Sequence, residues 1–353
     1  MPAPDQPTLE RIPSTPPVIL PVAGHLHRPQ WSVMIPAYNC LGYLGETLAS
    51  VLAQDPGPAH MQIMVVDDCS TDGDVAALVQ TIGKGRVDYY RQATNVGSLR
   101  NFETCLNRSV GHWVHILHGD DRVAVGFYAE IESLFRDHPE AGAAFTNTTN
   151  LTMGATGEKL MDRPPLVPER GIIKDFLFRI AEGQKLETPS IVVKRSVYEQ
   201  LGGFFAVHYG EDWEMWVRIA ARYPIAYSPR CLAQYRYLNS TSISTRYIKE
   251  GQNIRDITKV INIIQQYLPS EHRKELKKQA LRHYAGYCML LADSLYYTDS
   301  QACDAQRKGA IGMSKHPAVI YLAFKLYTKH LIQYKEIKRF LKKDSGLNTT
   351  QPK

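Results

Sequence analysis

The chain has 353 residues, of which 44% are hydrophobic and 22% are charged. This length and balance are typical of a globular protein with one main domain and an appendage. The net charge of +6 favours acidic partners such as phosphates, anionic lipid or nucleic acid. The six cysteines form no CxxC pair or Cys/His cluster, which argues against a zinc site or a small disulfide scaffold.

The first thirty residues are rich in proline and lack the basic start and apolar core of a signal peptide. We therefore predict a disordered tail over residues 1–30 and a cytoplasmic location. No apolar run approaches the roughly 18 residues that are needed to cross a bilayer. The sequence thus predicts a chain that does not span a membrane.

From residue 31 onward, short apolar segments alternate with segments of helical periodicity. "WSVMIPAYN" predicts a strand over residues 32–35 that ends at Pro36, and "YLGETLASVLAQ" predicts a helix after it. "MQIMVVDDCSTDG", "VDYYRQ" and "HWVHIL" predict three more strands, with helices at residues 75–80 and 98–110 between them. This alternation predicts an α/β fold with a mainly parallel sheet flanked by helices.

Polar side chains follow the end of each of these strands, and ligands bind beyond the carboxyl ends of such sheets. An isolated Gly-Asp-Asp is more typical of a solvated turn. Polar residues at the ends of four strands of one sheet favour a ligand site instead. The residues concerned are Tyr38 and Asn39, Asp67 and Asp68, Asn95, and Asp120 and Asp121.

Four segments, in this order and spacing, resemble the successive motifs of family 2 glycosyltransferases. They are "VMIPAYNCLGYLGETLASVLAQ", "IMVVDDCSTDG", "NVGSLRNFETCLNRSVGHWVHILHGDD" and "LGGFFAVHYGEDWEMWVRIA". The family consists of inverting enzymes with a GT-A fold, which is related to the Rossmann fold and binds nucleotide sugars. The resemblance covers residues 31 to 245 and implies a GT-A domain over residues 31–250.

The resemblance implies a nucleotide-sugar site at the first two motifs and at the "NxGxxxN" segment that follows. A carboxylate at Asp68 suits the imide N–H of uracil or thymine, which favours UDP or dTDP as the nucleotide. Tyr38 can equally be an ordinary half-buried aromatic. The residues carried over are Pro36, Ala37, Tyr38, Asp68, Asn95, Gly97 and Asn101.

Asp120 and Asp121 resemble the DxD-like metal motif of the family, which implies a divalent cation, Mg²⁺ or Mn²⁺. We expect Asp121 to be the direct ligand and Asp120 to lie nearer the ribose or a water ligand. Asp212 matches the catalytic base, which a sugar hydroxyl needs because it is a poor nucleophile near neutral pH. Glu211 and Trp213 are expected to orient the acceptor or the base. Alternatively, Asp212 only caps the helix that follows it.

One departure from the family is Leu238, which stands where a His often reaches the metal or diphosphate; Asn239, Ser240 or Ser242 would have to substitute. The segment 187–204 is expected to line the acceptor side.

After residue 250 the chain becomes helical and basic, which predicts an extension over residues 251–345 and a tail over 346–353. An apolar face there, with lysines around it, is typical of a membrane-surface helix or of a helix packed on the domain. The residues on that face are Tyr327, Leu331, Tyr334, Ile337 and Leu341.

The sequence therefore predicts a metal-dependent, inverting glycosyltransferase that uses a nucleotide-sugar donor. Its acceptor would be a hydroxyl of a glycan or lipid-linked molecule, in polysaccharide or glycolipid assembly, on the inner face of a membrane. Nucleic acid is not an expected partner. The alternative is a non-catalytic nucleotide-sugar or glycan-binding module of the same fold. A sugar-1-phosphate nucleotidyltransferase is less favoured, because no Gly-rich, basic phosphate loop follows the first strand.

Overall fold

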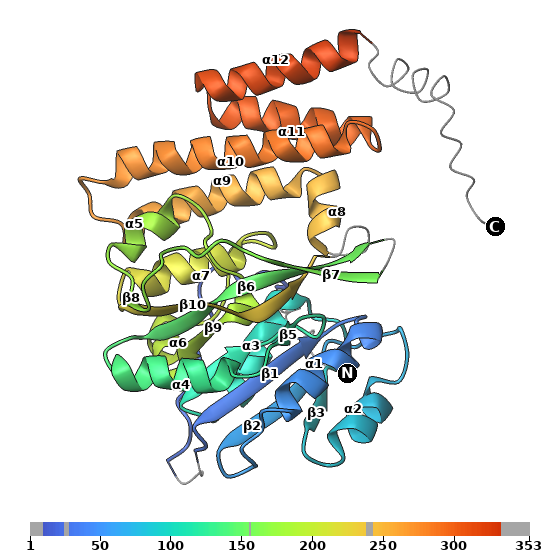
Figure 1. Ribbon diagram of the computed structural model, residues 1–353, viewed down its shortest axis with the longest axis vertical. Helices are drawn as coiled ribbons and strands as arrows, with labels where there is room; N and C mark the ends of the chain where they lie inside the picture. The colour runs from blue at the N-terminus through green and yellow to red at the C-terminus, as the bar shows by residue number, and fades with distance from the viewer. Residues whose placement is uncertain (1–9, 25–27, 155–156, 238–242, 333–353) are drawn as a thin grey trace, which may run out of the picture.

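The computed structural model describes residues 10–24, 28–154, 157–237 and 243–332. Within these residues, one sheet has the strand order β3-β2-β1-β4-β9-β6-β10-β5, with β7 beside β6 and β8 beside β10 (Figure 1). The strands are β1 (Trp31–Ala37), β2 (Met61–Asp67), β3 (Asp88–Arg91), β4 (Trp113–Ile116), β5 (Arg122–Val123), β6 (Ala143–Gly154), β7 (Gly157–Asp162), β8 (Gly171–Ile172), β9 (Ile191–Lys194) and β10 (Ile225–Arg236).

Helices lie on both faces of the sheet and in a stack beyond it. They are α1 (Leu41–Leu52), α2 (Val75–Gly83), α3 (Ser98–Arg108), α4 (Phe127–Asp137), α5 (Phe176–Ala181), α6 (Arg195–Leu201), α7 (Glu211–Ala220), α8 (Ile243–Lys249), α9 (Gln252–Ile264), α10 (Arg273–Leu295), α11 (Ser300–Met313) and α12 (Pro317–Leu331). Two short 3₁₀ helices are η1 (Thr188–Ser190) and η2 (Gln265–Tyr267).

The predicted α/β fold with a central sheet flanked by helices is confirmed. The strands β3, β2, β1 and β4 are all parallel, as the alternation of strands and helices predicts. Beyond β4 the sheet is mixed, because β9 runs antiparallel to both β4 and β6. The mainly parallel sheet of the prediction therefore describes the first half of the sheet, which carries the nucleotide motifs.

Alternation along β1 distributes its side chains between two hydrophobic cores. Val33 and Ile35 pack in the core under α1, α2 and α4, whereas Met34 packs in the core under α3 and α7. The prediction that Pro36 ends this strand is wrong, since β1 continues to Ala37. Pro36 lacks an N–H but still offers its carbonyl, which accepts a hydrogen bond from Gly119 at 3.1 Å.

The disordered tail predicted over residues 1–30 is wrong for the described part of that segment. Ile19 is 1% exposed and packs in the main core. The carbonyls of Pro13 and Pro17 accept hydrogen bonds from the backbone of Ala206 and Gly203 at 2.9 and 2.8 Å. Proline-rich composition thus produced an extended segment that the domain binds, since prolines keep their carbonyl acceptors. Residues 1–9 and 25–27 lie outside the described residues.

The helices α9 to α12 stack in layers beyond the sheet (Figure 1). The apolar face of α9, with Ile257, Val260 and Ile261, belongs to the same core as Trp216 of α7. The second half of α10 forms a separate small core with α11 and α12. The domain boundary at residues 250 and 251 stays a prediction, although α9 packs as part of the sheet domain.

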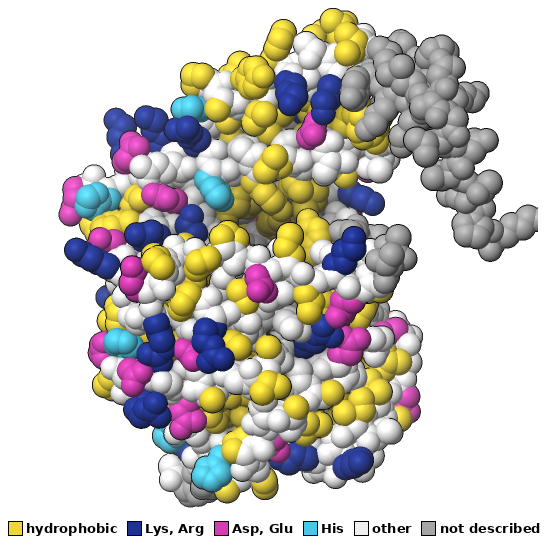
Figure 2. Space-filling model, in the orientation of Figure 1, with side chains coloured by type: hydrophobic (Ala, Val, Ile, Leu, Met, Phe, Trp, Pro, Cys, Tyr) yellow, Lys and Arg dark blue, Asp and Glu magenta, His cyan; other side chains and the backbone are white. Residues whose placement is uncertain are grey.

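The outer face of α12 is apolar and exposed. Figure 2 shows hydrophobic side chains gathered over this helix, with Lys and Arg side chains beside them. The exposed residues include Ile320, Tyr321, Phe324, Tyr327 and Leu331. Tyr334, Ile337, Leu341 and the tail over 346–353 lie outside the described residues. Among the helices that are described, none combines the length and the hydropathy of a membrane span.

Candidate active site

The loops that follow β1, β2 and β4 meet at the carboxyl edge of the parallel half of the sheet. The backbone N–H of Asp68 donates to the carbonyl of Ala37 at 2.8 Å, and that of Gly119 donates to Pro36. These hydrogen bonds tie the second and fourth strand ends to the first. The residues predicted for the donor site and for the metal therefore lie on adjacent loops, where ligands of such sheets bind.

The carboxylate of Asp68 organises the loop after β3. Its Oδ1 accepts from the backbone N–H of Val96 at 2.7 Å, and its Oδ2 accepts from Gly97 N–H at 2.9 Å and Asn95 Nδ2 at 2.8 Å. Burial raises the pKa of Asp68, while these backbone N–H groups and the charge of Arg11 oppose the rise. Three of the roughly four lone-pair positions of a carboxylate are thus in use, which leaves one for a ligand.

The other predicted donor-site residues differ in position. Pro36 and Ala37 are buried strand residues, and Tyr38 at the strand end is 43% exposed, which suits a ligand contact and an ordinary half-buried aromatic equally. Gly97 has φ +92° at the start of α3, a conformation that favours glycine. Asn101 is buried, and its Nδ2 donates to the carbonyl of Val66 at 2.9 Å. The structure thus places Asn101 behind β2, where it supports the strand.

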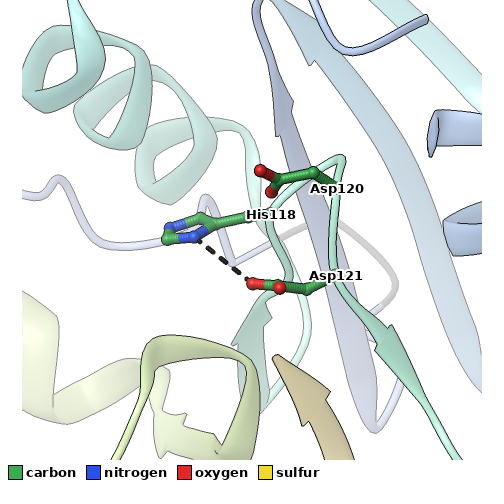
Figure 3. Close-up of side chains that lie close together, drawn as sticks. All are labelled: His118, Asp120 and Asp121. Carbon is green, nitrogen blue, oxygen red and sulfur yellow. Dashed lines mark ion pairs between the residues drawn. The ribbon is translucent and has the colours of Figure 1, made fainter. Parts of the chain in front are cut away.

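Among the described residues, one group of side chains has the spacing of a metal site: His118, Asp120 and Asp121, with one ligand atom from each lying within 4.8 Å of the others. Figure 3 shows these side chains at the turn after β4, where Nδ1 of His118 lies 3.6 Å from Oδ2 of Asp121. Oδ2 of Asp121 and Nε2 of His118 are buried and have no hydrogen-bond partner within the described chain. Since buried polar atoms normally have partners, this group fits a bound cation.

The turn that carries these ligands is held tightly from both sides. A Cβ on Gly119 would lie 2.7 Å from Sγ of Cys40, so a side chain there would displace the turn. From β10, the backbone N–H of Arg236 donates to Oδ1 of Asp121 at 2.7 Å, and its Nε donates to the carbonyl of Asp120 at 2.8 Å. The two aspartates are therefore fixed in place before any ligand binds.

Burial and neighbouring charge set the protonation of the group. Burial, followed by the charge of Asp120, raises the pKa of Asp121 well above its usual range. Burial lowers the pKa of His118, which keeps the imidazole neutral and able to bind a metal. A divalent cation would favour the ionised carboxylates, because metal ligands must be deprotonated.

Asp212 lies in the first turn of α7. Its Oδ2 accepts from Nε2 of Gln184 at 2.6 Å, and its Oδ1 accepts from the backbone N–H of Trp213 at 2.7 Å. Burial and the charge of Glu187 raise the pKa of Asp212 to about 7. The N-cap position belongs to Gly210, and no side chain caps the helix. Among the described residues, the only contact that supports the helix-cap interpretation of Asp212 is therefore its hydrogen bond with Trp213 N–H. The raised pKa of Asp212 suits a general base.

Glu187 connects the two acidic sites. Its charge raises the pKa of Asp121 as well as that of Asp212. Burial raises the pKa of Tyr235, and the charges of Glu187, Asp121 and Asp212 add to the rise. The 3₁₀ helix η1 touches both regions, since the carbonyl of Pro189 lies 3.0 Å from Nε2 of His115 on β4, and Oγ1 of Thr188 lies 3.5 Å from Oδ2 of Asp212.

The two predicted neighbours of the base occupy different environments. Burial and the charge of Asp212 raise the pKa of Glu211 well above its usual range, as expected of a carboxyl that shares the site. Trp213 is fully buried, its Nε1 donates to the carbonyl of Ile180 at 2.7 Å, and its ring packs against Tyr284. The structure thus places Trp213 beneath the site, where it supports α7 by packing instead of facing an acceptor.

Comparison with known proteins identifies the family. Residues 32–190 match the family described as glycosyl transferase family 2. TuaG of Bacillus subtilis, a candidate teichuronic acid biosynthesis glycosyltransferase, is 28% identical over 226 residues, which cover 62% of this chain and 84% of TuaG. The chain carries a family 2 glycosyltransferase domain. The match confirms the resemblance over the first three motifs, whereas Asp212 lies beyond the matched residues and the roles of the site residues stay predictions.

Solved structures with the same fold include two glycosyltransferases. Residues 1–349 of Staphylococcus aureus TarS give a TM-score of 0.58 at 16% identity, covering 91% of this chain and 93% of that one; TarS has also been crystallised with UDP-GlcNAc. The mannosyltransferase PcManGT of Pyrobaculum calidifontis, in complex with GDP-Man and Mn²⁺, gives 0.53 at 19% identity, covering 92% and 86%. These likenesses establish the GT-A fold of the family 2 enzyme.

Two residues of the site, His118 and Gln184, were not predicted from the sequence, whereas Glu187 begins the segment 187–204 that was expected to line the acceptor side. His118 stands three residues before Asp121 in "HGDD", so its spacing was a usable signal. Glu187 and Gln184 lie in a loop between α5 and η1 that carries no periodicity, and only the fold brings them to Asp212. Leu238, Asn239, Ser240 and Ser242 lie outside the described residues.

Proposed function

We propose that the enzyme transfers a sugar from a uridine or thymidine diphosphate sugar to a hydroxyl acceptor, in one step with inversion at the anomeric carbon. The observation that carries the proposal is that the group of His118, Asp120 and Asp121 after β4 and the carboxylate of Asp212 lie beside the same 3₁₀ helix, η1. A cation site for a diphosphate and a base for a hydroxyl are the two groups that this transfer needs.

The nucleotide end of the donor is assigned to the loops after β1, β2 and β3. Asp68 retains one lone-pair position for an imide N–H, and Tyr38 is exposed beside it on the next loop. Pro36, Ala37, Asn95, Gly97 and Asn101 would form or support this pocket. The crystallisation of TarS with UDP-GlcNAc supports a uridine nucleotide, whereas PcManGT carries GDP-Man.

The diphosphate end is assigned to Asp121 and His118, with Asp120 at the edge of the group. Two carboxylates supply the hard oxygen ligands that Mg²⁺ and Mn²⁺ prefer, and the unpartnered atoms of Asp121 and His118 support that assignment. When bound, such a cation would neutralise the negative charge that develops on the leaving nucleoside diphosphate.

Asp212 is assigned as the base that takes the proton of the acceptor hydroxyl on its carboxylate. A pKa of about 7 lets the carboxylate be ionised in a large share of molecules at neutral pH and still accept a proton. Gln184 fixes Oδ2, and Trp213 fixes Oδ1 through its backbone. The oxygen that loses the proton then attacks the anomeric carbon, and the bond to the diphosphate breaks on the opposite face.

The acceptor is assigned to the class of glycans and lipid-linked hydroxyls, in cell-envelope polysaccharide or glycolipid assembly. The exposed apolar face of α12, with Lys325 beside it, supports peripheral binding to the inner face of a membrane. The teichuronic acid name of TuaG supports an envelope polysaccharide.

A nucleotide-sugar panel tests the proposal. Purified enzyme with Mn²⁺ should release nucleoside diphosphate from a uridine or thymidine sugar, and EDTA should stop the release. Release from a guanosine sugar alone would contradict the base assignment, and release that EDTA does not change would contradict the cation.

A further inference from the structure

The segment 10–20, here called the N-terminal segment, lies ahead of the family 2 match and still belongs to the folded domain. The carbonyl of Glu10 accepts from Nε of Arg100 on α3 at 2.8 Å. Farther along, Pro13 and Pro17 bond the backbone at Ala206 and Gly203, a few residues before Asp212. The N-terminal segment thus runs from the donor side of the site to the loop that leads into the base.

Arg11 reaches from this segment into the loop that Asp68 organises. Its two terminal nitrogens donate to Asn95, one to the backbone carbonyl at 2.7 Å and one to Oδ1 at 2.6 Å. The same Asn95 donates to Oδ2 of Asp68. A Cβ on Gly97 would lie 3.2 Å from the guanidinium, so this glycine lets Arg11 lie close to the loop.

The guanidinium has donors left for a ligand. Of its five N–H groups, Asn95 takes two in the bonds that the described residues make. The Arg11 side chain is exposed, and its positive charge lowers the pKa of Asp68, which favours the ionised carboxylate. Arg11 and Asp68 therefore place donors and an acceptor side by side.

That pairing complements one kind of base. The imide edge of uracil or thymine presents an N–H between two carbonyl oxygens, so it needs one acceptor flanked by donors. Cytosine presents a ring nitrogen acceptor and an amino donor at the same edge. Because the ring nitrogen and an ionised carboxylate are both acceptors, they would repel each other. We propose that Arg11 binds the nucleotide base, donating to a carbonyl beside the imide N–H that Asp68 accepts.

This inference rests on the proposed function, because it requires a nucleotide at Asp68. The test measures dissociation constants of uridine, UDP and CDP for the full-length wild type, Arg11→Ala and Arg11→Lys. Arg28→Ala is the matched control, since Arg28 likewise donates two hydrogen bonds, to the backbone carbonyls of Val110 and Gly111, but lies away from the site. Thermal unfolding of each variant verifies that it is folded.

Arg11→Ala should weaken uridine and UDP by the same factor, about tenfold or more, as for a hydrogen bond to a charged group. It should also reduce the ratio of the CDP dissociation constant to the UDP dissociation constant. Arg11→Lys should recover part of the affinity through its charge, and Arg28→Ala should equal wild type. Unchanged uridine binding in folded Arg11→Ala, or a loss confined to UDP, would overturn the proposal. A wild type that binds neither uridine nor UDP would instead refute the proposed donor.

Discussion

Two Asp-Asp pairs follow the strands β2 and β4, which flank β1, and their oxygens are used in opposite ways. Asp67 accepts from the Tyr89 hydroxyl and pairs with Arg91, and Asp68 accepts three hydrogen bonds from the loop after β3. At the other pair, Asp121 has one satisfied oxygen and one buried oxygen without a partner within the described chain.

The difference teaches that the role of an Asp-Asp pair depends on how many hydrogen bonds its oxygens already accept from the chain. The oxygens of the first pair mostly accept hydrogen bonds from the chain itself and hold the loop after β3 in place. In the second pair, Arg236 holds one oxygen of Asp121, and the other oxygen, which has no partner within the described chain, is the one assigned to the proposed cation. Asp212 has features of both pairs. Both of its oxygens accept hydrogen bonds, as at Asp68, and its pKa is raised, as at Asp121.

The largest effect is expected on turnover, when the carboxylate of Asp212 is replaced by an amide. Asp212→Asn keeps the size of the side chain and an oxygen for Trp213 N–H but cannot take a proton. We expect turnover to fall by roughly 10²–10⁴, the usual contribution of a general base. UDP affinity measured by calorimetry should stay unchanged, and full turnover in Asp212→Asn would end its assignment as the base.

Matched Asp→Asn changes at the two pairs should move stability in opposite directions in EDTA at pH 8. The pKa of Asp121 is raised in the fold, so its ionisation costs stability as the pH rises above the usual aspartate value. Asp121→Asn should therefore raise the thermal midpoint. Asp68→Asn places an amide donor against the N–H groups of its loop, and it should lose about 1–3 kcal/mol.

Added Mn²⁺ completes this comparison. It should raise the midpoint of the wild type and of Asp68→Asn, because a ligand that binds the folded state stabilises it. It should leave Asp121→Asn unchanged. A rise of equal size in all three proteins would place the cation elsewhere.

The pH dependence of kcat/KM should separate Asp212 from the other acids. Because the base acts when ionised, activity should rise through pH 7 and level off above it. Gln184→Ala removes a donor that stabilises the ionised form, so the rise should move to higher pH. Gln301→Ala, an exposed site on α11, should keep the wild-type profile. An unmoved profile in Gln184→Ala would show that this bond does not tune the base.

Much of the fold and part of the site were predictable from local signals. The order of strands and helices, the strand-end positions of Asp68 and Asp121, and the helix after Asp212 follow from periodicity and motif spacing. The antiparallel β9 and the packed N-terminal segment were not predictable, since both depend on partners far away in the chain. Gln184 and Arg11 share this property: each reaches the site through tertiary contacts, with no motif around it.

The smallest effect is expected at α12, at the far end of the helical stack from the carboxyl edge of the sheet, and it concerns membrane binding. The exposed aromatic residues of α12 should hold the enzyme on anionic vesicles, where each basic group near the surface adds about 1 kcal/mol. Binding should weaken with salt, because charges are screened within about 10 Å at 0.1 M ionic strength. Phe324→Glu should reduce co-sedimentation with vesicles and leave nucleotide-sugar hydrolysis unchanged. Val125→Glu, at an apolar site on the sheet domain that is more exposed than Phe324, should change neither, and equal losses in both variants would show that α12 has no special role at a membrane.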